Sequence, residues 1–456
     1  MIPVHTRVAA IDDVEDHLQK IVWGLGKAGF CPIPFFFEDG KLQNEPAQPV
    51  PGIRIVFTDI HLIGGGPNQE KTHAANIIRC LKKIVSSGPY VLIFWSQYAV
   101  EEKDRMVKLI EERAGEAGLT PPIGYAAIDK KLVFNISPVE GEGDGFNPVK
   151  LRELILEKIK SFKTLAVVTS WEDRVERAAA RTTNRLFDLA KPSPTPADDW
   201  ERLLAFLACE TVGRTQAKES LRNALDLALL PLLEDQLALI GNEPSSAAED
   251  LENLLGVVSA EGRLQCPDAI SIPHLNSSYL IDETGLDASS RMWERGMVTE
   301  LGAGFINSGE FVRAFGHDNA TLIRNEFAFK ELSGRARLHV VELGPECDHV
   351  QGKLVTHRYL LALLVPESLI RDCRETSRSS GNIRYRNESV LDSGRIRLRE
   401  TADQDWHLLI SCRCFMTLAA QIAVDGRCRF RLRRALLEEV AHRYITHARR
   451  PGVMRW

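Results

Sequence analysis

The chain has 456 residues, of which 44% are hydrophobic and 26% are charged, and its formal net charge is −5. This composition is typical of a folded globular protein and excludes disordered, collagen-like and disulfide-scaffold chains. The length predicts two to four domains at roughly 100–200 residues each. The apolar runs are far shorter than the ~20 residues that span a bilayer, and acidic residues follow the N-terminal segment too soon for a signal peptide. We therefore expect a cytoplasmic protein without a membrane partner, whose nine cysteines are reduced.

The first 165 residues alternate between predicted strands and predicted helices. Runs of consecutive apolar residues predict strands buried on both faces, and apolar residues at helical spacing predict the helices between them. In chain order these are a strand at 7–11, a helix at 14–29, strands at 31–37 and 53–60, a helix at 71–86, a strand at 90–96, a helix at 100–117, a strand from 124–128 and 132–135, and a helix at 149–162. This alternation predicts a doubly wound, parallel five-stranded α/β domain of the flavodoxin-like type over residues 1–165.

Three further regions follow this domain. Residues 166–198 predict a connecting helix, with a capping box at Ser170, and a linker that carries three prolines between Lys191 and Asp198. Residues 199–260 are rich in leucine and alanine and predict a helical subdomain. Residues 261–456 combine short strand-like runs with a final helix, and they predict a mixed α+β domain of unknown function.

Residues with useful chemistry stand where the predicted N-terminal strands end. In chain order these are Asp12 and Asp13, Asp59, Ser96, and the pair Lys130 and Lys131. The carboxyl ends of parallel strands meet at the edge of the sheet where ligands bind, so we expect these side chains to converge there. Carboxylates that lie close together repel one another unless a cation holds them, and a set of oxygen ligands suits Mg²⁺.

This ordered set resembles the receiver domain of two-component response regulators, over about a third of the chain. The string VFTDIHLIGGG around Asp59 is similar to the strand and loop that carry the phosphoacceptor in that family. The resemblance implies that Asp59 accepts a phosphoryl group from a histidine kinase. It also implies that Asp12, Asp13 and Asp59 bind Mg²⁺ together with the backbone carbonyl of His61.

Two more positions follow from the same resemblance. Ser96 matches the hydroxyl that contacts the phosphoryl group in receivers, and Lys130 matches the lysine that pairs with it. Lys131 is an alternative to Lys130, because both follow the last predicted strand. We expect a phosphoacceptor signalling protein rather than an enzyme.

The long C-terminal region carries no recognisable output domain. A receiver without an evident effector resembles the accessory receiver proteins of Detocs-type bacterial phage-defence systems. That resemblance implies a phosphate sink in antiviral signalling, with a second receiver or effector protein of the same system as a partner.

The C-terminal region holds weaker candidates for a metal or enzymatic site. Cys412 and Cys414 alternate on a predicted strand, which would place them on one face, and Cys428 follows. With residues 347–349, which include Asp348 and His349, these cysteines are candidate zinc ligands. The stretch of residues 344–366 is also a candidate enzymatic site, because it brings polar residues close together in the sequence: Asp348, His349, Lys353, His357 and Arg358. A polar loop between two packed strands and ordinary core cysteines are the simpler interpretations.

Arginine is concentrated near the C-terminus, where residues 427–456 hold nine arginines and two glutamates. A docked terminal helix whose arginines pair with acidic neighbours is the simpler interpretation. The alternative is an anionic partner, which would make the protein a transcriptional or nucleic-acid-binding regulator, although the acidic segment after the linker disfavours contact with DNA. A third possibility is an effector enzyme in the C-terminal domain, switched on by phosphorylation of Asp59.

Overall fold

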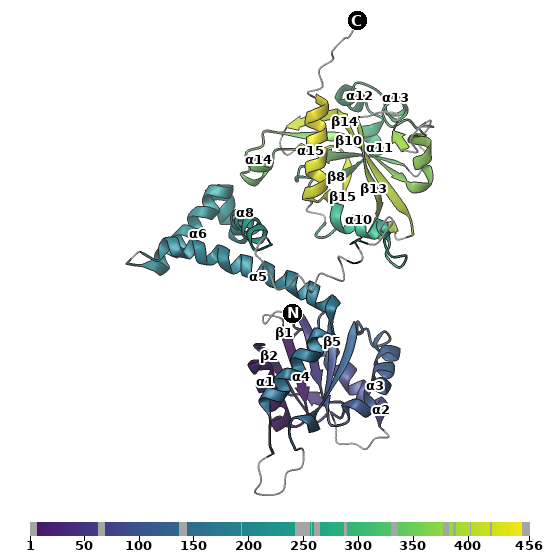
Figure 1. Ribbon diagram of the computed structural model, residues 1–456. Coiled ribbons are helices and arrows are strands. Elements are labelled where there is room, and N and C mark those ends of the chain that lie inside the picture. The colour runs from purple at the N-terminus through teal and green to yellow at the C-terminus, as the bar shows by residue number, and fades with distance from the viewer. Residues whose placement is uncertain are drawn as a thin grey trace. The chain divides into compact units, whose positions relative to one another are not determined.

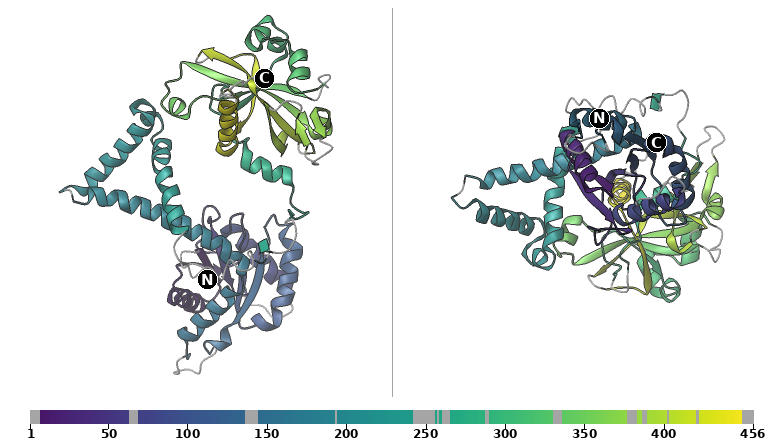
Figure 2. Two further views of the ribbon diagram at one scale, coloured as in Figure 1. Left: turned by 45° about the horizontal axis from the view of Figure 1, so that its top comes forward. Right: turned by 90° about the horizontal axis from the view of Figure 1, so that it is seen from below.

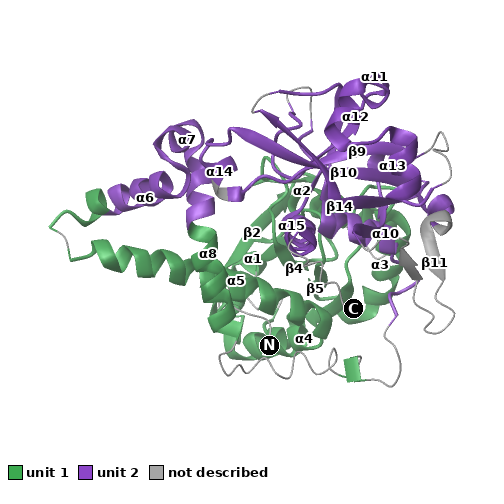
Figure 3. Cartoon of the chain, turned by 90° about the horizontal axis from the view of Figure 1, so that it is seen from above, with its two compact units in different colours: residues 1–199, 229–262 green, residues 200–228, 263–456 purple. Residues whose placement is uncertain are grey.

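The structure is a computed structural model of the chain that divides into two compact units, residues 1–199 with 229–262 and residues 200–228 with 263–456 (Figure 3). It describes residues 7–62, 69–135, 144–192, 194–241, 256, 258–259, 265–286, 290–329, 336–376, 383–385, 389–401, 403–419 and 422–448. None of the helices in these described ranges has the length and apolar character needed to cross a membrane.

The N-terminal unit contains a six-stranded sheet in the order β3-β2-β1-β4-β5-β6 (Figure 1). Strands β2, β1, β4, β5 and β6 run parallel, and β3 pairs antiparallel with β2 at the edge. The elements in chain order are β1 (Arg7–Asp12), α1 (Glu15–Lys27), β2 (Pro32–Glu38), β3 (Lys41–Leu42), β4 (Ile53–Thr58), α2 (Glu70–Ile84), β5 (Val91–Ser96), α3 (Ala99–Ala114), β6 (Gly124–Asp129), the 3₁₀ helix η1 (Lys130–Leu132), α4 (Pro148–Lys160) and α5 (Lys163–Ala190).

The predicted doubly wound sheet is confirmed, with three corrections. The short edge strand β3 was not predicted. Residues 132–135 do not continue the last strand, because the Asp129 carboxylate accepts a hydrogen bond from the backbone nitrogen of Lys131 at 2.8 Å and turns the chain into η1. The connecting helix begins at Lys163 rather than near Ser170, since Leu165 and Ala166 in its first turn are buried in the core of this unit.

Helices cover both faces of the N-terminal sheet (Figures 1 and 2). On one face, α1, α4 and the start of α5 enclose a core that includes Leu25 and Leu151. On the other face, α2 and α3 enclose a second core that includes Ile77 and Ile110. All six residues of β5 are buried, as expected for a central strand with helices on both sides.

Three helices form the segment that follows α5: α6 (Pro196–Val212), α7 (Arg214–Glu219) and α8 (Leu221–Gly241). The predicted proline-rich linker begins between α5 and α6, but its last three residues, 196–198, form the start of α6. Gly213 separates α6 from α7 with a φ of 84°, a conformation that glycine adopts without strain. A small apolar cluster packs the facing turns of these helices and consists of Ala208, Val212, Ala217 and Ala224.

The C-terminal unit is built on a seven-stranded sheet in the order β13-β14-β10-β9-β8-β15-β7, which confirms a mixed α+β architecture. The strand pairs that the structure describes in this sheet are antiparallel. Its elements are α10 (Ile272–Leu280), β7 (Ile281–Asp282), β8 (Met297–Leu301), α11 (Ala303–Ile306), α12 (Gly309–Phe315), α13 (Asn319–Asn325), β9 (Arg337–Glu342), α14 (Glu346–Val350), β10 (Thr356–Pro366), η2 (Glu367–Cys373), β11 (Arg374–Thr376), β12 (Ile383–Tyr385), β13 (Val390–Arg397), η3 (Arg399–Thr401), β14 (Asp405–Ala419), β15 (Gly426–Leu432) and α15 (Arg434–Ala448).

The two faces of this second sheet carry separate cores. Phe311 of α12 and Ile323 of α13 belong to the core on one face. Leu437 and Val440 of α15 belong to the core on the other face. The strands between them supply long apolar stretches, such as the buried run of β10.

An irregularity in β14 separates the two cysteines that were predicted to share a face. The pairing with β10 shifts between Leu360 and Ala362, so the residues of β14 near Cys412 and Cys414 form a bulge. Cys412 packs into one core of the sheet, and Cys414 packs against the other, as does Cys428. Within the described ranges, the groups of side chains arranged to hold a metal ion include no cysteine.

Candidate functional site

The predicted acidic residues lie at the edge of the N-terminal sheet where the strand order reverses. Strand β1 has β2 on one side and β4 on the other, so the chain winds outward in both directions from these central strands. Asp12 is the last residue of β1, and Asp59 directly follows β4. The backbone nitrogen of Asp59 donates to the carbonyl of Ile11 at 3.0 Å, which holds the two strand ends together. Ligands of open α/β sheets bind at such a switch point.

Lys130 occupies the centre of this site. Its Nζ donates to Oδ2 of Asp12 at 2.7 Å and also to Oδ2 of Asp59. The side chain is 1% exposed, and its Nζ lies 5.8 Å from the ring centroid of Trp95. Lys131 is exposed, and its ammonium group lies over the ring of Tyr98. Of the two candidate lysines, the structure therefore places Lys130 between the carboxylates.

Asp59 is held as an ionised carboxylate. Burial alone would raise its pKa, but the charge of Lys130 and hydrogen bonds from Lys130, the backbone of His61 and the Ser96 side chain together lower it below the ordinary value. The His61 backbone nitrogen donates to Oδ1 of Asp59 at 3.0 Å. A buried carboxylate that stays charged and accepts these hydrogen bonds is oriented by them, which suits a nucleophile.

In contrast to Asp59, the acidic pair Asp12 and Asp13 has raised pKa values. Burial raises the pKa of Asp12 to about 7, against the opposing charge of Lys130. Burial and the charge of Asp59 raise the pKa of Asp13 to about 6. The three carboxylates thus carry more negative charge than Lys130 neutralises. An additional cation would relieve this repulsion, and carboxylate oxygens are the ligands that Mg²⁺ prefers, so these residues fit a magnesium ion.

The sequence interpretation missed His17, which comes from the first turns of α1. Its Nδ1 lies 3.2 Å from Nζ of Lys130. Burial, together with the nearby charge of Lys130, lowers the pKa of His17 to about 4, so the ring is neutral at pH 7. His17 forms a group with Asp12 and Asp59, because each of the three offers one possible ligand atom and these atoms lie within 4.8 Å of one another. The only signal in the sequence is that His17 follows Asp12 by one to two helical turns, so it was not distinguishable from other polar helix residues.

The sequence interpretation also missed the side-chain contacts of His61. The sequence prediction assigned this residue only a backbone carbonyl, and that role stays a prediction. Its Nε2 lies 2.9 Å from Oε2 of Glu102, which comes from α3 and is 5% exposed. Its ring stacks on His73 of α2 with 4.4 Å between the centroids. The loop that carries Asp59 is therefore fastened to both helices on that face of the sheet.

The two predicted residues of the C-terminal unit, Asp348 and His349, are neighbours on one short helix. Asp348 and His349 both belong to α14, but of the two only His349 belongs to a group of side chains that could hold a metal ion. His357 belongs to the same polar stretch of sequence that was a candidate site, but Glu342, which ends the preceding strand, was not predicted. The side chain of Cys347, proposed with them, lies outside the described residues.

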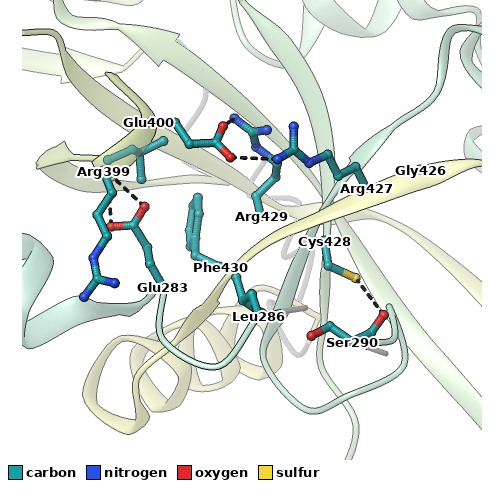
Figure 4. A pocket seen from close by; sticks show the side chains of 11 residues that line it. Glu283, Leu286, Ser290, Arg399, Glu400, Gly426, Arg427, Cys428, Arg429 and Phe430 are labelled. Carbon is teal, nitrogen blue, oxygen red and sulfur yellow. Dashed lines mark hydrogen bonds and ion pairs between the residues drawn. The ribbon is translucent and has the colours of Figure 1, made fainter. Parts of the chain in front are cut away.

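Two of the arginines near the C-terminus, Arg427 and Arg429, help to line a cavity of about 600 Å³ (Figure 4). Glu400 lies between the guanidinium groups of Arg427 and Arg429, at 2.7 Å and 2.8 Å. The carboxylate of Glu283 accepts a hydrogen bond from the backbone nitrogen of Arg399 at 3.0 Å. Each of the described arginines from 427 to 443 has a carboxylate partner, and these are Arg427, Arg429, Arg431, Arg433, Arg434 and Arg443.

This pairing favours a docked terminal element over a nucleic-acid surface. Arginines that bind phosphate groups neutralise the charge of the nucleic acid, and carboxylate partners at the same guanidinium groups oppose that. Arg449, Arg450 and Arg455 lie outside the described residues, so the prediction that concerns them stays a prediction.

Comparisons with known proteins add little to the evidence from this geometry. The sequence matches no known protein family, and no curated protein matches it. Among solved structures, full-length FixJ from B. japonicum is similar with a TM-score of 0.22 and 15% sequence identity, over 52% of this chain and 98% of that chain. A score this low carries no weight on its own. The function of the N-terminal unit is therefore argued from its parallel, doubly wound strand order and from the side chains gathered at the switch point.

Proposed function

We propose that the N-terminal unit is a phosphoacceptor of the response-regulator type, which takes a phosphoryl group on Asp59. The observation that carries this proposal is the contact of the Lys130 ammonium group with both Asp12 and Asp59 at the switch point of the sheet. Such a site offers an ionised nucleophile, a buried cation for the phosphoryl oxygens and acidic residues for a metal. An ion pair that served only to stabilise the fold would not require this combination of nucleophile, buried cation and metal-binding carboxylates.

In the proposed reaction, a carboxylate oxygen of Asp59 attacks phosphorus of a phosphohistidine on a histidine kinase. An acyl phosphate forms on Asp59 as the phosphorus–nitrogen bond breaks, and the electron pair stays on the imidazole, which takes up a proton from solvent. Lys130 exchanges a carboxylate partner for a phosphoryl oxygen, and the Ser96 hydroxyl donates to another. Mg²⁺ bound by Asp12, Asp13, Asp59 and the carbonyl of His61 would neutralise charge on the transferred group.

The partner in this proposal is a histidine kinase, and two roles follow for the phosphorylated form. A switch changes the output of the C-terminal unit after phosphorylation. A phosphate sink accepts the phosphoryl group without a change in output, which would buffer signalling to a second receiver in an antiviral system. The lifetime of the acyl phosphate, and any change in the C-terminal unit on phosphorylation, would separate the two roles.

A labelling experiment on the full chain tests the proposal. The protein is incubated with acetyl phosphate and Mg²⁺, and the phosphorylated fraction is measured by intact mass. We expect one phosphoryl group on the wild type, none in Asp59→Asn, and loss of the Mg²⁺ requirement or of labelling in Asp12→Asn/Asp13→Asn. Asp104→Asn serves as the matched control, because Asp104 is an exposed aspartate on α3.

Labelling of Asp59→Asn to the same extent as the wild type would overturn the proposal. Equal loss of labelling in Asp104→Asn would also count against it, because it would point to a general effect on the fold. Circular dichroism and thermal unfolding of each variant establish that the unit is folded.

A further inference from the structure

We propose that Glu342, His349 and His357 form a binding site for a divalent transition metal, with Zn²⁺ as the expected ion. The site lies entirely within the C-terminal unit and does not depend on phosphorylation of Asp59. It uses two imidazole nitrogens and one carboxylate oxygen, and these three ligand atoms lie within 4.8 Å of one another.

The distances within this cluster are close to those around a metal ion. Oε1 of Glu342 lies 2.9 Å from Nε2 of His349 and 3.1 Å from Nδ1 of His357. Two ligands of a tetrahedral zinc ion stand about 3.3 Å apart, given zinc–ligand distances of about 2.0–2.1 Å. The two distances from Oε1 of Glu342 are shorter than this spacing by about 0.4 Å and 0.2 Å.

The fold brings these ligands together from three consecutive elements. Glu342 ends β9, His349 lies on α14, and His357 lies at the start of β10. Glu342 pairs directly with Tyr359 across the two antiparallel strands. Because side chains alternate along a strand, His357 lies on the same face as Tyr359 and diagonally across from Glu342. Helix α14, in the connection between the strands, then supplies His349.

Two polar atoms of the cluster lack a hydrogen-bond partner, although Nδ1 of His357 hydrogen-bonds Oε1 of Glu342 at 3.1 Å. Glu342 is fully buried, and its Oε2 has no hydrogen-bond partner. Nε2 of His349 also has none, since its approach to Oε1 of Glu342 lacks the geometry of a hydrogen bond. Both histidines therefore approach the same oxygen while the other oxygen is unused. A purely structural ion pair would be expected to use both oxygens, because an unpaired buried carboxylate oxygen is costly.

Gly344 leaves the space that this arrangement needs. A Cβ atom at this position would lie 2.6 Å from Nε2 of His349 and 2.7 Å from Oε1 of Glu342. Both distances are too short for any side chain, so the backbone of residue 344 passes directly beside the proposed ligand atoms. A close approach of backbone to ligand groups is one of the situations that require glycine.

The ligand set points to zinc rather than to Mg²⁺. Two imidazoles and one glutamate are the protein ligands of several catalytic zinc sites, and they leave a fourth position open. Mg²⁺ prefers oxygen ligands and would instead be expected at the acidic site of the N-terminal unit. His349 is 13% exposed, which gives the ion a way in from solvent, whereas Glu342 and His357 are buried.

Metal binding by the full chain tests this proposal. The protein is treated with a chelator, desalted and titrated calorimetrically with Zn²⁺ in a buffer that contains excess Mg²⁺. We expect the wild type to bind one more equivalent of Zn²⁺ than His349→Ala or Glu342→Gln. His442→Ala is the matched control, because His442 is an exposed histidine of α15 in the same unit, and this variant should bind as the wild type does.

Substitution with Co²⁺ gives a second readout, since visible absorption bands report nitrogen and oxygen ligands in a tetrahedral geometry. We expect these bands in the wild type and in His442→Ala and not in His349→Ala. His349 is partly exposed, so its replacement by alanine should leave the fold intact even where Glu342→Gln does not. Equal Zn²⁺ stoichiometry and Co²⁺ spectra for wild type and His349→Ala would overturn the proposal. Acetyl phosphate labelling of Asp59 is expected to be the same in all these variants, which keeps this test separate from the proposed phosphoacceptor function.

Discussion

The ammonium group of Lys130 lies 2.7 Å from Oδ2 of Asp12, and both side chains are almost completely buried. The same ammonium group also contacts Asp59. Burial lowers the pKa of Lys130, but the charges of Asp59 and Asp12 reverse that effect and raise the pKa above its ordinary value. Removal of the lysine would leave two buried carboxylates without a counter-charge.

We therefore expect Lys130→Met to lower the free energy of unfolding by about 3–5 kcal/mol in the absence of divalent ions. Added Mg²⁺ should restore part of this loss, because a cation would then take over the neutralisation of Asp12 and Asp59. Urea denaturation with and without Mg²⁺ measures both effects. Lys131→Met, which changes an exposed lysine, should alter stability by no more than about 0.5 kcal/mol. Equal stabilities for the two variants would contradict this account.

A second prediction concerns two glycines of α1. A Cβ atom at Gly24 would lie 2.3 Å from Cδ2 of Leu151 on α4, whereas one at Gly26 would meet no atom within 4 Å. We expect Gly24→Ala to destabilise the protein by about 1–3 kcal/mol through overpacking. Gly26→Ala should instead raise stability by up to about 1 kcal/mol, because alanine is the better helix former. Thermal unfolding of both variants makes the comparison, and a shift of the same sign in both would be evidence against close packing at Gly24.

Much of the N-terminal fold was predictable because its strands are buried on both faces. An apolar run such as Val91–Ser96 has few alternatives to a central strand, and the helices between the runs show regular apolar spacing. The incorrect strand at residues 132–135 has a local cause that the apolar pattern does not report. There the Asp129 side chain caps the following turn, and side-chain capping competes with strand continuation.

The candidate site was predictable to the extent that it lies at strand ends. Parallel strands place their carboxyl ends at one edge, so Asp12 and Asp59 could be expected to approach each other from their positions alone. His17 and Glu102 could not, because a helical residue reaches the site only through the rotation of its helix about its axis. In the C-terminal unit, Glu342 and His357 meet through antiparallel register, which the order of residues does not reveal.

A third prediction concerns the buried carboxylate of Glu326, which is 1% exposed. It accepts hydrogen bonds from the hydroxyl groups of Ser389 at 2.8 Å and Ser411 at 2.6 Å, and from Nε of Arg413 at 2.6 Å. We expect Glu326→Ala to destabilise the C-terminal unit, at about 1–3 kcal/mol for each buried donor left unsatisfied.

Urea denaturation of the full chain measures this loss. Glu310→Ala is the control, because that glutamate is 70% exposed on α12. Its replacement should change stability by less than about 0.5 kcal/mol. If Glu326→Ala were as stable as the control, the hydrogen-bonded cluster would have no net role in stability.

The last prediction concerns acid stability and the buried ring of His339 on β9. Burial lowers the pKa of His339 from 6.5 to about 4, and its Nδ1 lies 2.8 Å from the carbonyl of Arg337. Between pH 6.5 and pH 4 the unfolded chain binds a proton at this ring and the folded chain does not. The free energy of unfolding should therefore fall as the pH falls through this range, with a contribution from His339 of at most about 1.4 kcal/mol per pH unit.

We expect His339→Asn, whose amide can still donate to the Arg337 carbonyl, to show a shallower decline than the wild type in urea denaturation at a series of pH values. His442→Asn changes an exposed histidine and should keep the wild-type slope. Because the other titrating groups are common to all three proteins, identical slopes for wild type and His339→Asn would show that the ring of His339 is not held neutral by the fold.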